Sequence, residues 1–588
     1  MKPDNQRQNK APLKEKEIVL VITTIVLLGL FCFIKLLSIS EITHAEGTTR
    51  WYQNYMPVSN NIFLSALTAL VPIAVMSMML AYKIPAHIAA LSALILNLFL
   101  AIGIWKMPLK LAISSTSMGM TIAIFPILWT LFNSVWIFNM IVEKGFFEIM
   151  KRSLSYVSMD RRIQTILIGF GFTSLLESFA AFGAPIAIIV AMLTGFGFPP
   201  MIAAVLALLS DTVSSSWGTQ SMPIMILNSV TKLDIHSLGY MIGLQTSISS
   251  ALLPAGLVIV LSGWKGFKGV WPVALTVGLA YSTAMVLTSY FLTPYIVGTT
   301  SAIVAILTTF IVLRFWSPKS IWSFPGDVKF TISEENSCKI TKLQILRAWS
   351  PYILLVLIIG LANCKGLKNG LSSICNIRVE WPGLHNAVWK TSPVVAGQEA
   401  YPAVYSQPLL AVGGSLVFFA GLVSSFILGI PLKKAFQVYI STLKKLFIPS
   451  LTIVSILGMS YLMNYSAMTY TIGVAFAATG FWFPMAITFL GMLGCMMGGS
   501  VAASNALFGN LALVAGNQIG INPVLSAGAL SAGSTMGKSI AFQNLVIATT
   551  SLNTEMKEGD LLIRVLWISV IYTFIIGLVS MLLQNIFQ

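Results

Sequence analysis

The segment Leu176-Glu177-Ser178-Phe179-Ala180-Ala181-Phe182-Gly183-Ala184-Pro185 interrupts a long apolar region with small residues, one acid and one proline. From residue 163 to residue 231 the only charged residues are Glu177 and Asp211. Glycine and proline release backbone groups from helical hydrogen bonding. At membrane depth, such groups persist only where they are buried in protein or line a wet cavity. The segment therefore predicts a broken helix inside a membrane protein.

The composition of the whole chain supports this interpretation. Of 588 residues, 56% are apolar and 9% are charged, and the mean hydropathy is +0.85. Soluble domains are about 25% charged, so a water-soluble enzyme is excluded. The apolar character also runs nearly end to end, which excludes a single anchor on a soluble domain. No segment alternates with period two, as a membrane barrel requires. We predict an all-α polytopic membrane protein with roughly 12–15 transmembrane helices of about 20 residues each.

A second region repeats the pattern of the first. From residue 446 to residue 554 the only charge is Lys538, and small residues interrupt the run at 498–505 and 531–538. In addition, Gly195-Phe196-Gly197-Phe198-Pro199 and Gly480-Phe481-Trp482-Phe483-Pro484 each head an apolar segment that ends in a break. Paired, Gly/Pro-interrupted segments in two halves of a membrane protein indicate the site of a transporter. We therefore expect inverted repeats with broken or re-entrant helices.

The basic residues predict the orientation of the chain. The net charge is +16, and the basic residues gather in four clusters, at the N-terminus, 144–162, 314–347 and 433–445. Because Lys and Arg accumulate in cytoplasmic loops, we place all four clusters in the cytoplasm and the protein in the cell membrane. This arrangement also makes nucleic-acid binding unexpected. The segment 363–406 is then an outer loop, in which Cys364 and Cys375 are able to form a disulfide.

The expected organisation has an N-terminal extension and one permease domain. Residues 1–50 form a cytoplasmic tail and an extra helix at 18–39, with a cleaved signal peptide ending at Thr43-His44-Ala45 as the alternative. Residues 51–588 form the permease domain, with a first half at about 51–262 and a second half at about 348–588. Besides the broken regions, we expect spans at 62–82, 85–105, 113–142, 240–262, 270–291, 295–313, 348–362, 407–430, 446–463 and 562–584.

Three isolated charges are the strongest candidates for chemistry. A charge at the centre of a membrane helix costs about 2.5–3.5 kcal/mol, so Glu177, Asp211 and Lys538 serve either a structural ion pair or a function. Lys538 and the N-termini of half-helices suit a carboxylate, and Glu177 can carry a proton when it is desolvated. Ser504, Asn505 and Gln543 are able to orient a small organic anion, or equally to form interhelical hydrogen bonds.

Other chemistries lack their sequence signatures. The five cysteines and four histidines have no metal-ligand spacing, and there is no P-loop, H-E-x-x-H or G-x-S-x-G motif. We therefore expect no metal, no cofactor and no enzyme activity. An ion channel is disfavoured because its site more often has a symmetric ring of charges or carbonyls.

Several motifs resemble those of the L-lactate permease family, in order and from about residue 51 to the end. They are Trp51-Tyr52-Gln53-Asn54-Tyr55, Leu176-Glu177 followed by Phe182-Gly183-Ala184-Pro185, Ser504-Asn505-Ala506-Leu507-Phe508, and Gly537-Lys538. The resemblance implies a carrier of the cytoplasmic membrane that takes up lactate, and often glycolate, with protons. The expected substrate-binding residues are Lys538, Ser504, Asn505, Gln543 and Gly183, and the expected proton-coupling residues are Glu177 and Asp211.

The chain also departs from the family pattern near these residues. Ser178, Phe179 and Ala181 replace small residues before Phe182, and Val501, Ala502 and Ala503 replace an acid and hydroxyl residues. Ala541-Phe542-Gln543-Asn544 replaces the family's Ser-Pro-Gln-Ser motif after the lysine, and Asp211 stands where the family usually has Asn. A different organic anion, a different coupling ion or a transport-deficient sensor are therefore the alternatives to lactate or glycolate symport.

Overall fold

The computed structural model describes residues 50–82, 84–155, 158–179, 183–324, 341–362, 365–395, 397–551 and 558–587. The expected helix at 18–39, the alternative cleavage site and residues 180–182 of the first break lie outside the described residues. Cys364 also lies outside them, and Cys375 is a free thiol.

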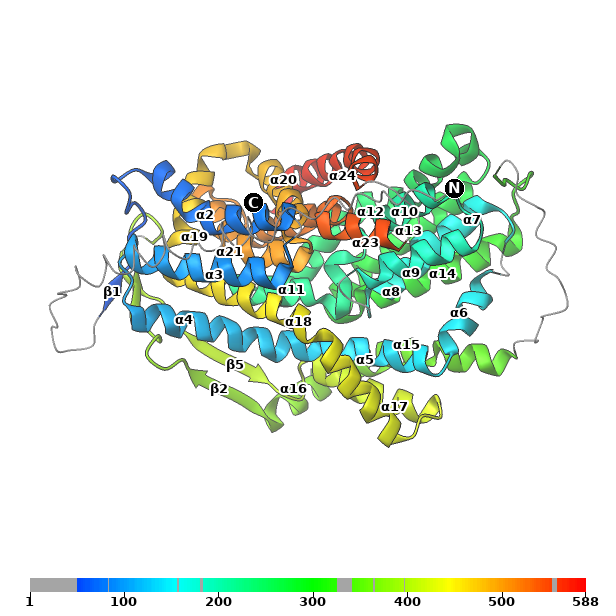
Figure 1. Ribbon diagram of the computed structural model, residues 1–588, viewed down its shortest axis with the longest axis horizontal. Coiled ribbons are helices and arrows are strands. Elements are labelled where there is room, and N and C mark those ends of the chain that lie inside the picture. Colours follow the sequence, from blue (N-terminus) through cyan, green and yellow to red (C-terminus); the bar gives the residue numbers. More distant parts are fainter. Residues whose placement is uncertain are drawn as a thin grey trace, which may run out of the picture.

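Long apolar helices make up most of the described chain, which confirms a polytopic α-helical membrane protein (Figure 1). Ten helices in the described ranges are long and apolar enough to span a membrane, or eleven if one bent pair counts as a span. The spanning helices, some with short irregular turns inside, are α2 (Ile62–Ala81), α3 (Ala86–Gly103), α4 (Leu109–Ile122) with α5 (Trp129–Glu143), α12 (Ile235–Lys268), α13 (Trp271–Phe291), α14 (Val297–Phe315), α15 (Lys342–Ala362), α18 (Leu432–Tyr465), α19 (Met468–Phe476) with α20 (Phe483–Gly498), and α24 (Glu558–Phe587).

These ten or eleven spans belong to the described residues alone, whereas the expected 12–15 includes the helix at 18–39, which lies outside them. Helices α9 (Ala184–Gly195) and α17 (Gly413–Ile427) have 12 and 15 residues, too few to cross a membrane alone. The expected span at 407–430 begins only at Gly413, because residues 404–408 pair as a strand. Two further short helices, α6 (Phe146–Ser155) and α16 (Lys365–Ile374), are amphipathic connectors.

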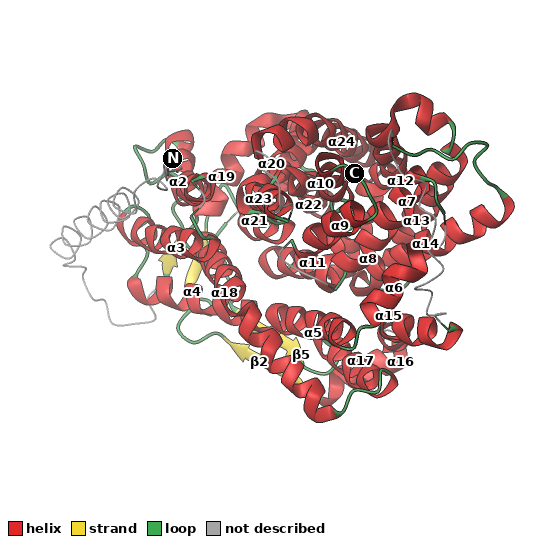
Figure 2. Cartoon of the chain, turned by 45° about the vertical axis from the view of Figure 1, so that its right-hand side comes forward, coloured by secondary structure: helices red, strands yellow, loops and turns green. Residues whose placement is uncertain are grey.

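The five short strands form two separate sheets, one at an end of the helix bundle, which we call the strand end, and one along the side of the bundle (Figures 1 and 2). Strand β1 (Trp51–Tyr52) pairs in parallel with β3 (Val388–Lys390), which pairs antiparallel with β4 (Glu399–Ala400). Strands β2 (Asn376–Glu380) and β5 (Val404–Pro408) form an antiparallel ribbon. Gln53 joins this region to the bundle by donating hydrogen bonds to the carbonyl oxygens of Asn464 and Tyr465 at the end of α18.

The opposite end of the bundle carries buried basic residues, and we call it the basic end. Here α7 (Arg161–Gln164) begins with Asp160, whose carboxylate lies 2.6 Å from the Arg162 guanidinium. Arg162 also donates to the carbonyl oxygens of Gly266, near the end of α12, and of Ser320. These contacts hold the start of α7 against the end of α12 at the basic end.

The first pair of broken elements starts from the basic end. After α7, the irregular helix η2 (Thr165–Phe172) and α8 (Thr173–Glu177) lead to the break, and α9 returns. Phe198, just after α9, lies with its ring 5.5 Å from the Arg161 guanidinium, so this helical hairpin begins and ends at the basic end. The chain then continues through α10 (Pro200–Ser210), η3 (Ser215–Trp217) and α11 (Gly218–Thr231), which are bent by 61° at the break.

The second pair runs in the opposite sense. Helices α20 and α21 (Val501–Ile519) form a hairpin that begins and ends at the strand end, where Gln518 donates to the carbonyl oxygen of Pro393. The chain then passes through α22 (Pro523–Gly537), η7 (Lys538–Ile540) and α23 (Phe542–Thr550) toward the basic end. Close helix contacts hold this unit together, because Gly533 of α22 packs directly on the carbonyl group of Thr488 of α20.

The two similar Gly-Phe-x-Phe-Pro motifs occupy different places in these units. Gly195–Pro199 joins the first hairpin to the bent helix pair, whereas Gly480–Pro484 leads into the second hairpin. Each motif does precede a helix that ends at a break, as expected. The topological counterpart of the first motif is instead the turn before α22, at residues 520–523.

Candidate functional site

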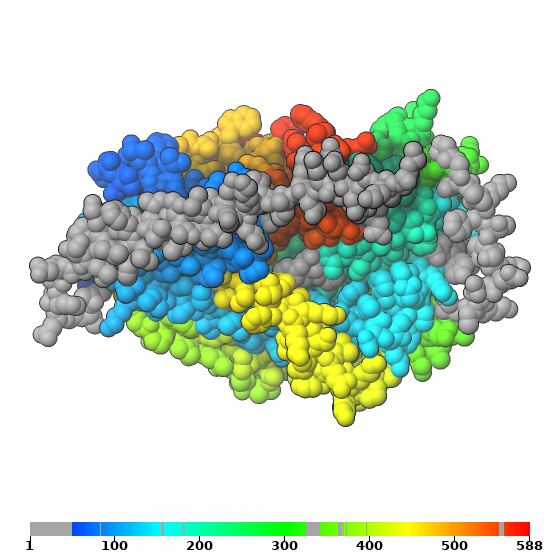
Figure 3. All heavy atoms as spheres, viewed as in Figure 1, coloured from blue at the N-terminus to red at the C-terminus, as the bar shows by residue number. Residues whose placement is uncertain are grey.

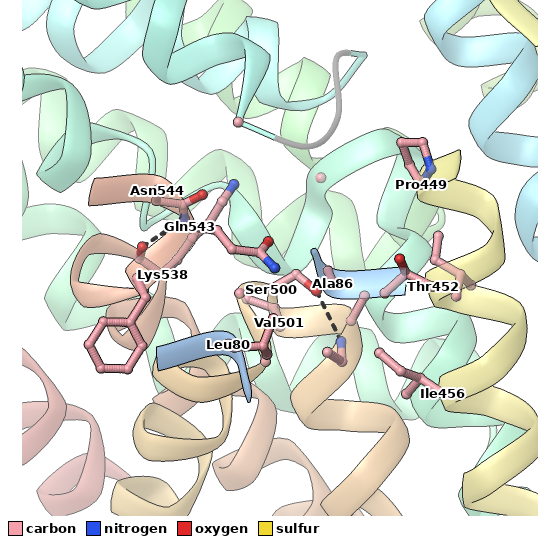
Figure 4. A pocket seen from close by; sticks show the side chains of 18 of the residues that line it. Leu80, Ala86, Pro449, Thr452, Ile456, Ser500, Val501, Lys538, Gln543 and Asn544 are labelled. Atoms are coloured by element: carbon pink, nitrogen blue, oxygen red, sulfur yellow. Dashed lines mark hydrogen bonds between the residues drawn. The ribbon is translucent and has the colours of Figure 1, made fainter. Parts of the chain in front are cut away.

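The two breaks and the two hairpin tips meet at a cavity of about 500 Å³ inside the bundle. Figure 4 shows Lys538, Gln543 and Asn544 on one side of this cavity and Pro449, Thr452 and Ile456 of α18 on the other. Glu177 and Gly183 from the first hairpin, and Ser500 from the second, also line it. The cavity therefore lies where all four interrupted elements end.

A buried cluster of three charges lies at the inner wall of this cavity. The Lys538 ammonium is 2.6 Å from a Glu177 carboxylate oxygen and 2.8 Å from Asp211 Oδ2. Glu177 and Lys538 are each 7% exposed and line the cavity, whereas Asp211 is fully buried behind them. An ammonium between two carboxylates satisfies the need of each charge for a partner at low dielectric. We call these three residues the charge triad.

The backbone on both sides of Glu177 is shaped to hold its carboxylate. A side chain at Gly218, the first residue of α11, would place its Cβ 2.5 Å from Glu177 Oε1. Two residues later, Gln220 donates from its backbone N–H and from Nε2 to the carbonyl oxygen of Ser178. Thr219, Gln220 and Ser221 all have left-handed backbone angles. A left-handed backbone conformation costs each non-glycine residue about 1–2 kcal/mol, so this turn is strained. Such strained residues cluster at functional sites in proteins.

The break after α22 holds Lys538 in a comparable way. Asn544 Nδ2 donates to the Lys538 carbonyl oxygen at 2.8 Å, which ties the first turn of α23 to the break. At the tip of the second hairpin, Gly499 has φ of 76°, and a Cβ there would lie 2.5 Å from Gln543 Oε1. Glycine at this tip therefore permits both the turn and the close approach of Gln543.

Three helix N-termini point their first turns into the cavity. They are those of α9 at Gly183, of α21 at Ser500–Ala503 and of α23 at Phe542–Leu545. Ser500 caps α21 by accepting from the Ala503 N–H, but no side chain caps α9 or α23. Each N-terminus carries a partial positive charge of about half a unit. The cavity wall thus favours an anion beyond the contribution of Lys538 alone.

The rest of the wall is mostly apolar. It is formed by the corner between α2 and α3, at residues 80 and 84–87, and by the middle of α18, at residues 448–457. Figure 3 shows the blue N-terminal helices beside the yellow α18 on one face, and α3 packs directly against α18. His87 and Glu558 are the titratable residues of this outer part of the lining. A ligand here can have both a carboxylate and an apolar part.

The structure brings most of the expected site residues together. Lys538, Glu177, Gln543 and Gly183 line the cavity, and Asp211 contacts Lys538 from behind. Gly183 has φ of 78° and packs on Ile547 of α23, so it shapes the wall. It has no side chain to offer a ligand.

Ser504 and Asn505 lie elsewhere. Ser504 Oγ donates to the carbonyl oxygen of Gly491 and accepts from Ser534, whereas Asn505 Nδ2 donates to the Pro223 carbonyl and to Ser531 Oγ. Both side chains are fully buried between helices and do not line the cavity. They therefore form interhelical hydrogen bonds, the alternative role that the sequence left open. The sequence-based set of site residues did not include Ser500, Asn544 or Gly218, although each stands beside a break that the sequence does reveal.

The sequence matches a known protein family over most of its length. The family model described as L-lactate permease matches residues 65–587. The chain belongs to this family. It is 34% identical to the glycolate permease GlcA of Escherichia coli strain K12, over 91% of this chain and 98% of that protein. It is also 33% identical to the L-lactate permease of Salmonella typhi (90% and 98%) and 32% identical to that of Bacillus subtilis strain 168 (92% and 99%).

Two solved structures align with most of this chain at low TM-scores. MtrF of Neisseria gonorrhoeae, described as an antimetabolite efflux pump, aligns with a TM-score of 0.44 at 13% identity, over 81% of this chain and 84% of its own. The YdaH transporter of Alcanivorax borkumensis aligns with a TM-score of 0.40 at 11% identity, over 80% and 87%. The permease relatives establish that this L-lactate permease family member is a multi-pass membrane transporter and not an enzyme.

Proposed function

We propose that the protein takes up a small 2-hydroxy monocarboxylate, of the lactate or glycolate type, together with a proton across the cell membrane. The observation that carries this proposal is the sharing of one ammonium by two carboxylates, of which only Glu177 faces the cavity. The names of the permease relatives supply the substrate class.

The charge triad couples the anion to a proton by competition for Lys538. With all three groups ionised, the triad has a net charge of −1, and Lys538 has no need of a further anion. When Glu177 takes a proton from the cavity, its hold on Lys538 weakens and the triad becomes neutral. A substrate carboxylate can then take the place of the Glu177 carboxylate beside Lys538 and restore the net charge of −1.

Asp211 has a different role in this scheme. It is fully buried and does not line the cavity, so the substrate cannot displace it. It therefore stays beside Lys538 as a fixed counter-ion and keeps the ammonium charged and in place. Glu177 therefore transfers the proton, and Asp211 balances the charge of Lys538.

The remaining cavity residues orient the substrate. Ser500, Gln543 and Asn544 offer polar groups to the 2-hydroxyl, and the uncapped N-terminus of α23 offers backbone N–H donors to the carboxylate. The apolar wall at α18 accommodates the methyl group of lactate. Ser504 and Asn505 hold the second hairpin against α22 and are not included in the proposed binding site.

The position of the cavity defines the state of the carrier. The cavity extends to the corner between α2 and α3, one 20-residue helix, or about 30 Å, away from the strand end. With the basic end in the cytoplasm, as the positive-inside rule favours, the cavity faces inward. The two oppositely running units, within halves at 51–262 and 348–588, act as the inverted repeats that alternate access between the two sides.

The test is uptake by the purified protein in proteoliposomes. Labelled L-lactate and glycolate are offered with equal pH on both sides and with an alkaline interior. We expect saturable uptake of at least one of them, with accumulation above equilibrium only when the interior is alkaline. Uptake driven by a sodium gradient alone, or no uptake of either anion, would overturn the proposal.

A further inference from the structure

A second cavity, of about 260 Å³, lies between the bundle and the strand β5. Its lining includes the last turns of α11, the middle of the α4–α5 helix at 122–127, and residues 404–407 of β5. Asn228, Ser229, Lys232, Ser406 and Gln407 make this cavity polar. We call it the strand-end cavity, because its residue Lys232 contacts Tyr461, one turn before α18 ends at the strand end.

Lys232 is the charged residue of the strand-end cavity lining, and its ammonium is not neutralised there. It donates to the Tyr461 hydroxyl at 3.0 Å, and that hydroxyl donates onward to the Ser229 carbonyl oxygen at 2.6 Å. Among the ion pairs of the described residues, none includes Lys232. The nearby Asp234 carboxylate accepts from Ser237 at the start of α12 instead.

The Lys232 ammonium therefore has N–H groups left with which to bind an anion. An ammonium has three N–H groups, of which the Tyr461 hydroxyl occupies one. Tyr461 also lies with its ring 5.3 Å from the ammonium, which orients the side chain. Asn228 lines the same cavity and uses one of its N–H groups on the Leu233 carbonyl, leaving a second donor. This is the donor set of a small-anion site.

We call the cavity at the charge triad the central cavity. The strand-end cavity and the central cavity follow one another along α11 and α18. On α11, Met222 and Ile226 line the central cavity, whereas Met225 and Asn228 line the strand-end cavity. On α18, Leu457 lines the central cavity and Tyr461, one turn further, contacts Lys232. Met222, Met225 and Ile226 are buried between the two spaces and separate them.

We propose that Lys232 and the polar residues of the strand-end cavity form an entry site, which captures a small monocarboxylate from the strand-end side before it reaches Lys538. This inference rests on the proposed function for its substrate class. In the inward-facing state the apolar residues between the cavities keep the captured anion outside. A change of state that parts them would pass the anion along α11 to the charge triad.

The experiment compares the two faces of the membrane. The KM for L-lactate or glycolate is measured in right-side-out vesicles, which present the strand end, and in inside-out vesicles. Two variants change the charge of the strand-end cavity: Lys232→Gln removes the ammonium, and Gln407→Glu adds a carboxylate. Lys106→Gln is the matched control, because Lys106 lies at the same end of the bundle, between α3 and α4, and outside both cavities.

We expect Lys232→Gln and Gln407→Glu each to raise the KM at the strand end about five- to tenfold, the effect of losing or opposing one partly solvated charge contact. The KM from the other face should change less than twofold, and Lys106→Gln should change neither. If Lys232→Gln fails to reach the membrane, Gln407→Glu decides alone. Wild-type KM at the strand end in the two cavity variants would overturn the entry site, whereas absence of uptake by the wild-type protein would instead refute the proposed function.

Discussion

At the scale of single residues, the proposed coupling depends on Lys538 and the two carboxylates that contact it. Taking three charges out of water costs several kcal/mol for each ion, and only close pairing returns that energy. The contacts of 2.6 and 2.8 Å provide this pairing. A structural and a functional role of these charges are therefore compatible, since in the proposed mechanism a proton and a substrate open the same ion pair that stabilises the resting state.

The first prediction concerns Glu177. Glu177→Gln imitates a permanently protonated side chain, so Lys538 should stay available to the substrate while the proton can no longer be released. We expect proteoliposomes with this variant to exchange labelled for unlabelled lactate, but not to accumulate lactate when the interior is alkaline. Glu143→Gln is the control, because Glu143 pairs with Lys434 at the surface, where both are about half exposed. Accumulation at the wild-type level by Glu177→Gln would remove Glu177 from the coupling.

The second prediction concerns the stability of the charge triad. Lys538→Met leaves Glu177 and Asp211 buried without their counter-ion, which should cost about 3–5 kcal/mol. We expect a clearly lower melting temperature of the purified protein and no lactate binding. Adding Asp211→Asn removes one of the two stranded charges, so the double variant should recover most of the lost stability without recovering binding.

Melting temperature and lactate affinity, measured on both variants, separate these effects. A single variant that melts like the wild type would show that the buried pairing is not what holds the break together. A double variant that binds lactate normally would show that Lys538 is not the anion's partner.

At the scale of elements, the shape of each break decides whether the triad can form. Gly218 begins α11 directly after the break, and the strained turn that follows it closes on Ser178 of the first hairpin. Glu177 fits only because position 218 has no side chain. The bent helix pair and the first hairpin therefore act as one unit at this point.

The third prediction tests that fit. Gly218→Ala places a methyl group against the Glu177 carboxylate, and a displacement of about 1 Å at a reacting group can reduce a rate about 100-fold. We expect uptake in vesicles to fall at least tenfold at unchanged expression. Gly195→Ala is the matched control, since a Cβ at Gly195, at the end of α9, meets no atom within 4 Å. Equal uptake by the two variants would contradict the close packing described at Gly218.

Much of this element structure follows from local sequence. Glu177, Asp211 and Lys538 stand out because a charge in an apolar run has few physical explanations, and the breaks stand out because glycine, serine and proline disrupt helices. Which side of a helix faces a cavity is not local. Ser504 and Asn505 sit beside a real break, yet their side chains face α20, α11 and α22, because the hairpin packs there.

Topology is also beyond local sequence. The motifs at Gly195 and Gly480 look alike because each starts a helix that ends at a break, and nothing in either motif says whether a hairpin or a crossing pair follows. The wall that α18 and the α2–α3 corner give to the cavity is likewise a product of long-range packing. Apolar residues such as Ile456 carry no signal that distinguishes a cavity wall from a lipid-facing surface.

At the scale of the whole molecule, two cavities follow one another along α11 and α18, with buried apolar residues between them. The two cavities lie on different sides of this barrier. Lys538 lines one and Lys232 lines the other. Two oppositely oriented units around a shared charge triad provide the two-state element that alternating access needs. In the proposed mechanism the carrier moves this barrier in two forms, either empty or with a proton and an anion bound together.

The most direct test of this coupling is its charge balance. Wild-type protein in proteoliposomes is given a pH gradient or a membrane potential, each imposed separately by ionophores, and the steady-state accumulation of labelled L-lactate is measured. In the proposed mechanism one proton on Glu177 accompanies one monocarboxylate on Lys538, so accumulation should follow the pH gradient with one proton per anion and should not respond to the membrane potential. Accumulation that follows the membrane potential, or that ignores the pH gradient, would contradict the exchange of carboxylates on Lys538.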